Sequence, residues 1–346
     1  MEPAFAIVIV AFRSGAVLQS LVDALGAQTR ADFEVVIVDN ACPDGSVEAL
    51  ALADARFRTI RAGHNLGFAG GCNLGARATS APWIVTLNPD TCPDADWLGS
   101  LADAIARWPE GRIFGCTQLA MDAPGKMDAL GKVDGFGDVL SIFGVSWRGG
   151  YGQPVRQLPD ADIVVLSPCA AAAIYHRETF ERLGGFDESY FCYLEDVDLG
   201  LRFRASGHDT IQLRDVSVPH AGSEGSVAPL GFAADQSARN MPRLLIKTTP
   251  APLLLPTLAV ALLSRTYLAI RNRPSLSGAL REICSFGAAL FARTHWAARA
   301  DTPKLPTGSW LRSVSRSRSE LRHRSIRALD PVDSTRWTAA GRSQRR

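Results

Sequence analysis

The sequence predicts an α/β fold, a doubly wound and mainly parallel sheet followed by C-terminal helices. In the first hundred residues, continuous apolar, β-branched runs alternate with segments whose apolar residues recur at helical spacing. Continuous runs of this kind are typical of strands buried on both faces of a parallel sheet. The chain has 346 residues, of which 47% are hydrophobic and 21% charged. It is therefore long enough to bury a large core, which excludes a disordered or collagen-like protein.

The elements follow in order along the chain. Residues 5–12 (FAIVIVAF) form the first apolar run, and the following segment has Val17, Leu21 and Leu25 on one helical face. Gly184 and Gly185 end one later helix, and Gly207 ends another. The predicted strands are 5–12, 33–38, 57–60, 83–87, 163–166, 170–175 and 210–213. The predicted helices are 17–25, 46–53, 73–79, 178–183 and 197–206.

Residues 120–160 are rich in Gly and Asp and show weak periodicity. This composition predicts a loop or irregular strands, which we expect to cover a substrate groove. Such a groove has a defined place in a doubly wound sheet, because ligands bind there beyond the carboxyl ends of the strands. The polar residues at those ends are Arg13, Asp39, Asn40, Asn88 and Asp90.

Charge divides the chain into an acidic front and a basic back. Residues 1–240 contain 18 Lys and Arg against 30 Asp and Glu, and residues 241–346 contain 19 against 5. Different roles for the two parts follow from this asymmetry. We expect a catalytic domain over 1–240, a helical and membrane-associated segment over 241–300, and a basic, disordered tail over 301–346.

The membrane interpretation depends on residues 252–263 (PLLLPTLAVALL), which are strongly apolar, contain Pro256 and have arginines on both sides. A spanning helix needs about 20 apolar residues, so this run is better suited to lie in the interface of an anionic membrane. A helix packed on the protein is the alternative.

Seven cysteines are scattered without a C-x-x-C pair or a zinc-like Cys/His cluster, which predicts reduced thiols in a reducing compartment. The N-terminus lacks the basic segment of a signal peptide, so its apolar run is predicted as a strand. Together these features predict a cytoplasmic enzyme, peripheral at the cytoplasmic face of the membrane.

Three segments contain chemistry-bearing residues. Asp90, in an Asn-Pro-Asp turn after a strand, is either turn chemistry or a ligand for a divalent cation. Glu195, Asp196 and Asp198 open a helix, where acids either cap the helix or supply a general base. The glycine-rich segment 64–73 precedes a helix, a place where backbone amides can approach a phosphate. A fourth candidate, His220, follows a strand and gains interest only if the fold brings it near Asp90.

The sequence lacks the motifs of the dinucleotide-binding and P-loop proteins. Residues 11–15, after the first strand, do not form G-x-G-x-x-G, and no P-loop occurs. A sugar-nucleotide pyrophosphorylase remains an alternative, although its basic, glycine-rich loop is poorly matched at the same place. A noncatalytic nucleic-acid binder using the basic tail is a second alternative. The acidic front opposes it, because phosphate affinity rests on Lys and Arg, so no specific nucleic-acid partner is expected.

Considered together, nine segments resemble the family-2 inverting glycosyltransferases, in particular their bacterial rhamnosyltransferase-like branch. Each segment is short, but their order and spacing cover residues 5–247, leaving the C-terminal third unmatched. The segments are 7–12 (IVIVAF), 28–29 (QT), 36–41 (VIVDNA), 44–46 (DGS), 65–71 (NLGFAGG), 87–91 (LNPDT), 184–188 (GGFDE), 193–199 (YLEDVDL) and 239–240 (RN).

The resemblance implies a GT-A fold with an acceptor-binding half, a nucleotide-sugar donor, and Mg²⁺ or Mn²⁺. Asp196 would be the catalytic base. Asp90 and His220 would be metal ligands, with Asn88 standing where the family usually has the first acid of its D-x-D motif. The donor-binding residues would be Ala11, Phe12, Arg13, Asp39, Asn65, Gly67, Asn73 and Asn88. By their position, Glu195, Phe191 and Tyr193 would lie on the acceptor side.

The sequence thus predicts a metal-dependent, inverting hexosyltransferase in cell-envelope polysaccharide synthesis. The expected donor, by resemblance, is dTDP-rhamnose, and the expected acceptor is a lipid-linked or polymeric glycan at the membrane. The chemistry agrees, because inversion needs a base for the acceptor hydroxyl and positive charge at the leaving diphosphate.

Overall fold

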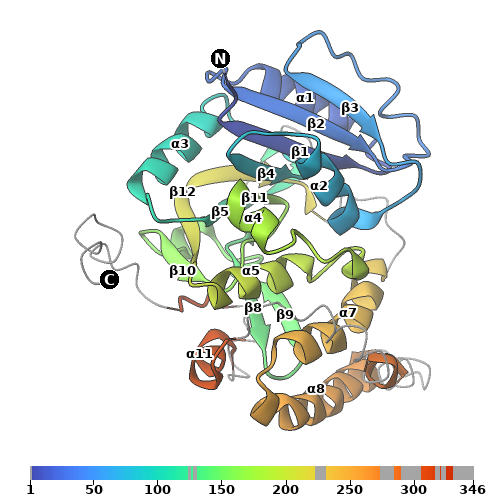
Figure 1. The fold of residues 1–346 in the computed structure, drawn as a ribbon, viewed down its shortest axis with the longest axis vertical. Coiled ribbons are helices and arrows are strands. Elements are labelled where there is room, and N and C mark those ends of the chain that lie inside the picture. The colour runs from blue at the N-terminus through green and yellow to red at the C-terminus, as the bar shows by residue number, and fades with distance from the viewer. Residues whose placement is uncertain are drawn as a thin grey trace.

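A computed structural model describes residues 2–123, 126–127, 131–222, 231–272, 284–289, 305–315, 320 and 325–329. Its centre is a ten-stranded sheet with the order β10-β12-β5-β11-β4-β1-β2-β3 and two short strands paired to β5 (Figure 1). The predicted α/β fold with a mainly parallel sheet is confirmed.

The first half is the parallel part of the sheet. β1 pairs with β2 and β4, and β2 pairs with β3, all in parallel. Every residue of β1 is buried, as expected for an apolar strand covered on both faces. The elements of this half are β1 (Phe5–Ala11), α1 (Val17–Gly26), β2 (Phe33–Asp39), β3 (Phe57–Arg61), α2 (Gly67–Arg77), β4 (Trp83–Leu87) and α3 (Trp97–Arg107).

The second half mixes directions. β11 runs antiparallel to both β4 and β5, whereas β12 runs parallel to β5. The main elements are β5 (Ile113–Ala123), β10 (Ile163–Val165), β11 (Ala172–His176), α4 (Arg177–Arg182), α5 (Glu195–Ala205) and β12 (Thr210–His220). The short ones are β6 (Lys126–Met127), β7 (Val133–Gly135), η1 (Val155–Gln157) and η2 (Glu188–Tyr190).

Helices cover both faces of the sheet. One face packs with Leu21 of α1 and Leu101 of α3, and the other with Cys72 of α2, Phe180 of α4 and Phe203 of α5. Alternate residues of β1 enter the two cores, which explains why its sequence is apolar without a break.

A third core joins the C-terminal helices to the rest. It is built by α5, the small hairpin β8 (Asp138–Ser141) and β9 (Val145–Arg148), α7 (Phe232–Thr248), α8 (Ala251–Asn272) and α11 (Thr307–Ser313). α8 and α11 lie at the end of the molecule furthest from β3 (Figure 1). The predicted domain boundary at residue 240 falls inside α7.

One sequence expectation, the helix over 46–53, is wrong here. Residues 46–49 form turns and residues 50–53 have no regular structure, because the Ala51 N–H donates to Gln19 Oε1 at 3.0 Å instead of to a carbonyl one helical turn before it. Within residues 301–346, α11 is a helix with Trp310 buried in the third core. Most of the tail lies outside the described residues.

Candidate active site

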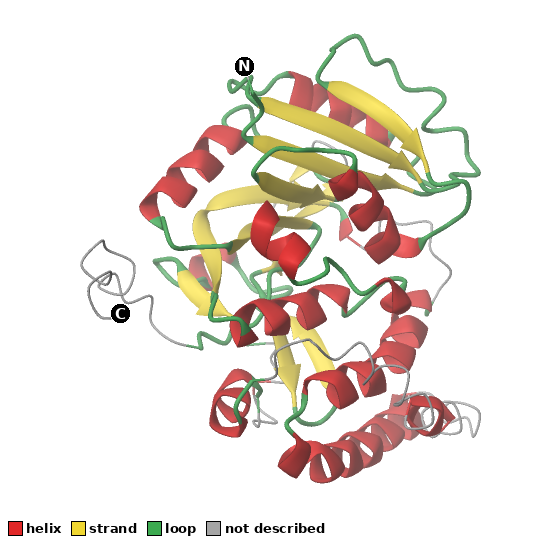
Figure 2. Cartoon of the chain, in the orientation of Figure 1, coloured by secondary structure: helices red, strands yellow, loops and turns green. Residues whose placement is uncertain are grey.

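The parallel strands bring their polar carboxyl ends to one edge of the sheet (Figure 2). Asn40, directly after β2, is buried and holds the glycine-rich segment there. Its Nδ2 donates to Asn65 Oδ1 at 3.0 Å and to the Gly67 carbonyl at 3.2 Å, and its Oδ1 accepts from Leu66 N–H at 2.8 Å. The predicted donor residues Asn65 and Gly67 therefore lie beside the end of β2.

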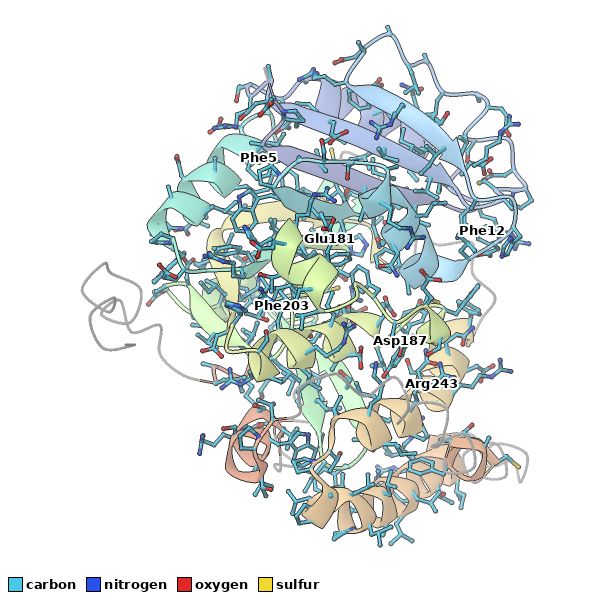
Figure 3. All side chains as sticks on the ribbon, in the orientation of Figure 1. Phe5, Phe12, Glu181, Asp187, Phe203 and Arg243 are labelled. Atoms are coloured by element: carbon cyan, nitrogen blue, oxygen red, sulfur yellow. The ribbon has the colours of Figure 1, made fainter. Side chains whose placement is uncertain are left out.

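The ends of β1 and β2 carry the other predicted donor residues. Asp39 is buried, and its Oδ1 accepts from Cys42 N–H at 2.9 Å. After Ala11 the chain turns through Arg13 in a left-handed conformation, with φ of 54°. Phe12 is exposed at this end (Figure 3), and the Arg13 guanidinium lies 5.6 Å from the centre of its ring. An exposed aromatic ring next to a cation is suited to face a nucleotide.

Asn73 has a different environment. Its Nδ2 donates to the Phe186 carbonyl at 2.8 Å and to Glu188 Oε1 at 3.0 Å, while its Oδ1 accepts from Phe186 N–H at 3.0 Å. The amide is buried and ties α2 to the segment before α5. Both the nitrogen and the oxygen of this amide therefore have partners within the protein. A structural role explains Asn73 without any contact to a nucleotide sugar.

His220 reaches the turn after β4 because β12 ends beside it. Cys92 N–H donates to the Pro219 carbonyl at 3.0 Å, and Ala221 N–H donates to the Asp90 carbonyl at 3.1 Å. His220 Nε2 consequently lies 3.2 Å from Asp90 Oδ1 and 3.3 Å from Asn88 Nδ2. The condition set by the sequence for His220 is met.

The other ring nitrogen of His220 has a carboxylate partner that the sequence did not point to. Nδ1 lies 2.7 Å from Asp134 Oδ2, and that carboxylate also pairs with Arg148. Burial pulls the pKa of His220 down, but its hydrogen bonds to Asp134 and Asp90 outweigh burial and raise the pKa to about 9. A carboxylate on the second ring nitrogen is the usual companion of a metal-ligating histidine.

The donor set fits a hard divalent cation in part. Asp90 Oδ1 and His220 Nε2 lie 3.2 Å apart and are the candidate ligands, while the Asn88 amide nitrogen, 3.3 Å from Nε2, is a hydrogen-bond donor; the described residues contain no group of three His, Cys, Asp or Glu side chains that could hold a metal ion. Mg²⁺ and Mn²⁺ commonly complete their coordination with substrate phosphates and water. Asp90 could therefore hold such an ion together with a diphosphate, and His220 could join it once the proton that its raised pKa keeps on the ring is released.

The three acids at the start of α5 have three different environments. Asp196 is half-buried, with Oδ2 accepting from Ala170 N–H at 3.2 Å and Oδ1 from Val197 N–H at 2.8 Å, and burial raises its pKa. Glu195 is buried, and its Oε2 has no hydrogen-bond partner among the described residues. Burial and the nearby charge of Asp196 raise the pKa of Glu195.

Asp198 is structural. It is fully buried and accepts ion pairs from Arg202 at 2.8 Å and from Lys247 of α7 at 2.7 Å. Of the three acids, Asp196 alone is both partly accessible and raised in pKa, which are the properties of a general base.

A short segment connects the metal-candidate turn to Asp196. Asn88 N–H donates to the Ala171 carbonyl at 2.9 Å, and Ala170 N–H donates to Asp196 Oδ2. Two adjacent residues therefore bind the turn after β4 on one side and the candidate base on the other. The candidate cation ligands and the candidate base are therefore joined through residues 170–171.

The aromatic residues predicted for the acceptor side, Phe191 and Tyr193, lie in the loop before α5. Phe191 packs on the glycine-rich segment so closely that a Cβ on Gly67 would lie 2.3 Å from the Phe191 carbonyl oxygen. Gly67 has φ of +71°, so both its conformation and this contact require glycine. Tyr193 is exposed, with its ring 6.2 Å from that of Phe232 in α7.

Sequence reasoning missed Asp134, Asp138 and Arg148, which lie in the region expected to be irregular. Asp138 on β8 is buried and accepts from Ser167 Oγ at 3.1 Å, and burial together with the charge of Asp196 raises its pKa. The pairing of β7 with β5, which has a register shift between Gln118 and Leu119, and the pairing of β8 with β9 place these side chains. The repeated Gly and Asp of 131–138 marked the region but did not identify its partners.

Comparison with known proteins gives the same class of molecule. The model of the family "Glycosyl transferase family 2" matches residues 6–183, just over half of the chain. A Mycobacterium tuberculosis protein named N-acetylglucosaminyl-diphospho-decaprenol L-rhamnosyltransferase is 28% identical over 237 residues, which cover 64% of this chain and 76% of that protein. The Myxococcus xanthus O-antigen biosynthesis protein RfbC is 32% identical over 205 residues, covering 55% of this chain and 15% of that protein.

Solved structures share the fold at low sequence identity. Residues 1–349 of S. aureus TarS give a TM-score of 0.51 at 14% identity, covering 86% of this chain and 81% of that one. The mannosyltransferase PcManGT from Pyrobaculum calidifontis, solved with GDP-Man and Mn²⁺, gives 0.51 at 17%, covering 88% and 84%. GalNAc-T7, solved with UDP, GalNAc and Mn²⁺, gives 0.57 at 13%, covering 87% and 58%. These similarities confirm the predicted GT-A fold.

Proposed function

The chain belongs to glycosyl transferase family 2, and from that premise we propose that it transfers rhamnose from dTDP-rhamnose to a lipid-linked or polymeric glycan in cell-envelope polysaccharide synthesis. The names of the bacterial relatives support both the sugar and the acceptor class. One observation carries the proposal for this chain: residues 170–171 hydrogen-bond Asn88 on one side and Asp196 on the other. Family membership favours a transferase over the pyrophosphorylase and the nucleic-acid binder.

Asp196 is proposed to act as the general base. It takes the proton of the acceptor hydroxyl while that oxygen forms a bond to the anomeric carbon of the donor sugar. The bond between this carbon and the diphosphate oxygen breaks on the opposite face, so the configuration inverts. A raised pKa makes Asp196 a better proton acceptor than an ordinary exposed carboxylate.

Asp90 and His220, with Asn88 beside them, are proposed to hold Mg²⁺ or Mn²⁺. When bound, the ion supplies positive charge to the diphosphate leaving group. Asp134 orients the imidazole so that Nε2 faces Asp90. We assign nucleotide contacts to Ala11, Phe12, Arg13, Asp39, Asn65 and Gly67, and the acceptor side to Glu195, Phe191 and Tyr193.

The C-terminal helices are proposed to rest on an anionic membrane at its cytoplasmic face. The window Ala251–Leu268 of α8 has a mean hydropathy of 1.4 with 22% of its residues buried, so composition alone permits a membrane span. Leu254, Leu258 and Ala261, however, pack into the third core. A helix held on one side by protein cannot be surrounded by lipid, so we favour an interfacial position.

The exposed side of α8 supports that position. Four large apolar side chains on it are exposed: Leu255, Leu263, Tyr267 and Ile270. At about 100° per residue they fall within roughly a third of the helix circumference. An uncharged stripe of this kind is typical of helices that lie in a membrane interface.

The donor proposal is tested by thermal shift of the purified chain against nucleotide sugars, with and without Mn²⁺. A ligand that binds the folded state raises the melting temperature by mass action. We expect a shift with dTDP-rhamnose that needs the metal, followed by sugar transfer to a polyprenyl-diphosphate acceptor. A shift with another sugar nucleotide alone would contradict rhamnose as the donor, and the absence of transfer from any donor would contradict the function.

The membrane proposal is tested by cosedimentation with vesicles containing phosphatidylglycerol. Leu263→Glu with Ile270→Glu should reduce the bound fraction about tenfold or more, because charged side chains on the stripe must be moved out of the lipid. Thr59→Glu, exposed on β3, is the matched control and should bind like the wild type. Unchanged binding of the double variant would contradict the assignment of α8, and a dimer dispersed by the variant would identify a second copy as the occupant of the stripe.

A further inference from the structure

A buried amide of the helix α7 contacts the loop that precedes α5. Asn240 Nδ2 lies 2.8 Å from the carbonyl oxygen of Tyr190, 2.9 Å from that of Cys192 and 2.8 Å from that of Tyr193. Asn240 is buried, so water cannot replace these contacts. One side chain therefore gathers three carbonyl groups of a four-residue loop, residues 190–193.

The same loop has an unusual backbone. Phe191, Tyr193 and Leu194 have φ angles of 64°, 68° and 73°, in the left-handed region that residues with a Cβ rarely adopt. Backbone of this kind persists only where surrounding contacts hold it, and it concentrates at functional sites. Directing three carbonyl oxygens to one amide is such a contact.

The loop connects the two parts of the candidate site. At one end the Phe191 carbonyl accepts from Ala69 N–H at 3.1 Å, next to Gly67 in the glycine-rich segment. At the other end, Leu194 leads directly into α5, which begins with Glu195 and Asp196. A change in the loop would therefore move the candidate base relative to the donor edge, which is formed by the carboxyl ends of β1, β2 and β4.

Two further residues on the same face of α7 support the loop from both sides. Arg243 donates to the Ser189 carbonyl, and its guanidinium lies 5.6 Å from the centre of the Tyr190 ring. Lys247 Nζ lies 2.8 Å from Asp187, before the loop, and 2.7 Å from Asp198, after it. Figure 3 labels Asp187, before the loop, just above Arg243 of α7.

We propose that Asn240 is a positioning residue for sugar transfer, holding the loop in the conformation that has Phe191, Tyr193 and Leu194 at positive φ, so that Asp196 faces the reacting centre. This inference rests on the proposed function. A role in catalysis is thereby assigned to α7, the helix that contains the domain boundary predicted from the charge distribution. Asn240 acts through the loop and touches neither the donor edge nor Asp196.

The test is steady-state kinetics of Asn240→Ala, with Gln236→Ala on the same helix as control. Misplacing a reacting group by about 1 Å can cost 100-fold in rate, so we expect kcat to fall about 30- to 100-fold while donor affinity changes less than about threefold. Asn240→Asp keeps the size but points a second oxygen at three carbonyl groups, so it should fall at least as far. Gln236→Ala should match the wild type.

Hydrogen exchange of residues 190–196 and alkylation of Cys192, both read by mass spectrometry, report the loop itself. Both rates should rise in Asn240→Ala and stay unchanged in Gln236→Ala. In a Tyr193→Gly background, where glycine adopts a positive φ freely, Asn240→Ala should cost less turnover than in the wild type. That smaller cost separates positioning from a general loss of folding.

Different outcomes refute different claims. Wild-type turnover by a folded, donor-binding Asn240→Ala variant would overturn the positioning role and leave the proposed function intact. Equal losses of donor affinity and kcat would overturn it as well, since they indicate a general structural role. A wild-type chain that transfers no sugar would refute the proposed function, and the positioning role with it.

Discussion

The donor edge and the loop of residues 190–193, which is the proposed catalytic loop, hold their candidate functional residues in different ways. At the donor edge, Asp39 ends β2 and receives its hydrogen bond from Cys42, three residues later. In the catalytic loop, residues 190–193 are held by Asn240, which lies 47 to 50 residues further along the chain. The first arrangement follows from strand ends in a parallel sheet, and the second requires a distant helix to dock.

This difference predicts how each region fails. A donor-edge residue can be removed while the sheet still places its neighbours, because the strand register belongs to the backbone. The conformation of the catalytic loop depends on a few buried side chains of α7, which hold backbone with positive φ. A single change there should therefore shift the position of the candidate base. The two regions should therefore separate donor binding from turnover.

The largest effect is expected for Asp196→Asn, which should lower turnover about 1,000-fold or more, because the amide cannot accept the proton. Donor affinity should stay near wild type, since the donor edge is untouched. Turnover by mass spectrometry and donor binding by calorimetry measure the two quantities. Asp103→Asn, exposed on α3, is the control, and wild-type turnover in Asp196→Asn would show that another group is the base.

The next largest effect is expected on the stability of the packing between α5 and α7. Lys247→Met leaves Asp198 fully buried with one cation fewer and should cost about 3 kcal/mol of unfolding free energy, measured by urea denaturation at pH 7. Arg239→Met, exposed on the same helix, should cost far less. A cost equal to that of the control would show that α7 does not stabilise the loop through charge.

The same variant carries a pH signature. Burial raises the pKa of Asp187, but the neighbouring Lys247 and hydrogen bonds lower it well below its usual range. A depressed carboxyl pKa contributes stability above the unfolded value of about 3.9, and the contribution is lost as the pH falls further. The difference between Lys247→Met and wild type should therefore be largest near pH 7 and narrow below about pH 4.

A smaller effect is expected at the donor edge. With Mn²⁺ present, Asp90→Ala should weaken binding of the nucleotide sugar about 10- to 100-fold, because the proposed ion loses a carboxylate while His220 and Asn88 remain. Without metal, the same change should alter binding little. Calorimetry of the nucleotide sugar in both conditions measures this, with the exposed Asp94→Ala as control. An equal loss with and without metal would mean that Asp90 contacts the donor itself.

The strand ends show how much of the site could be read from the sequence. Arg13, Asp39, Asn88 and Asp90 follow apolar runs, and parallel pairing brings those runs to one edge. The wrong helix over 46–53 shows the limit of the same reasoning, because the Ala51 N–H donates to the side chain of Gln19, which lies 32 residues earlier in the chain. The amphipathic spacing of Trp97, Leu98, Leu101 and Ala104 did mark α3, although no helix was predicted there.

The sequence by itself determined the α/β fold, the family and the residues at the strand ends. These depend on patterns among near neighbours, which repeat every two residues in a strand and every three or four in a helix. Only the tertiary structure brought Asp134 to His220, joined Asn88 to Asp196 through residues 170–171, and placed Asn240 over the catalytic loop. Those contacts form between segments far apart in the chain, so they exist only once the sheet and the C-terminal helices have packed together.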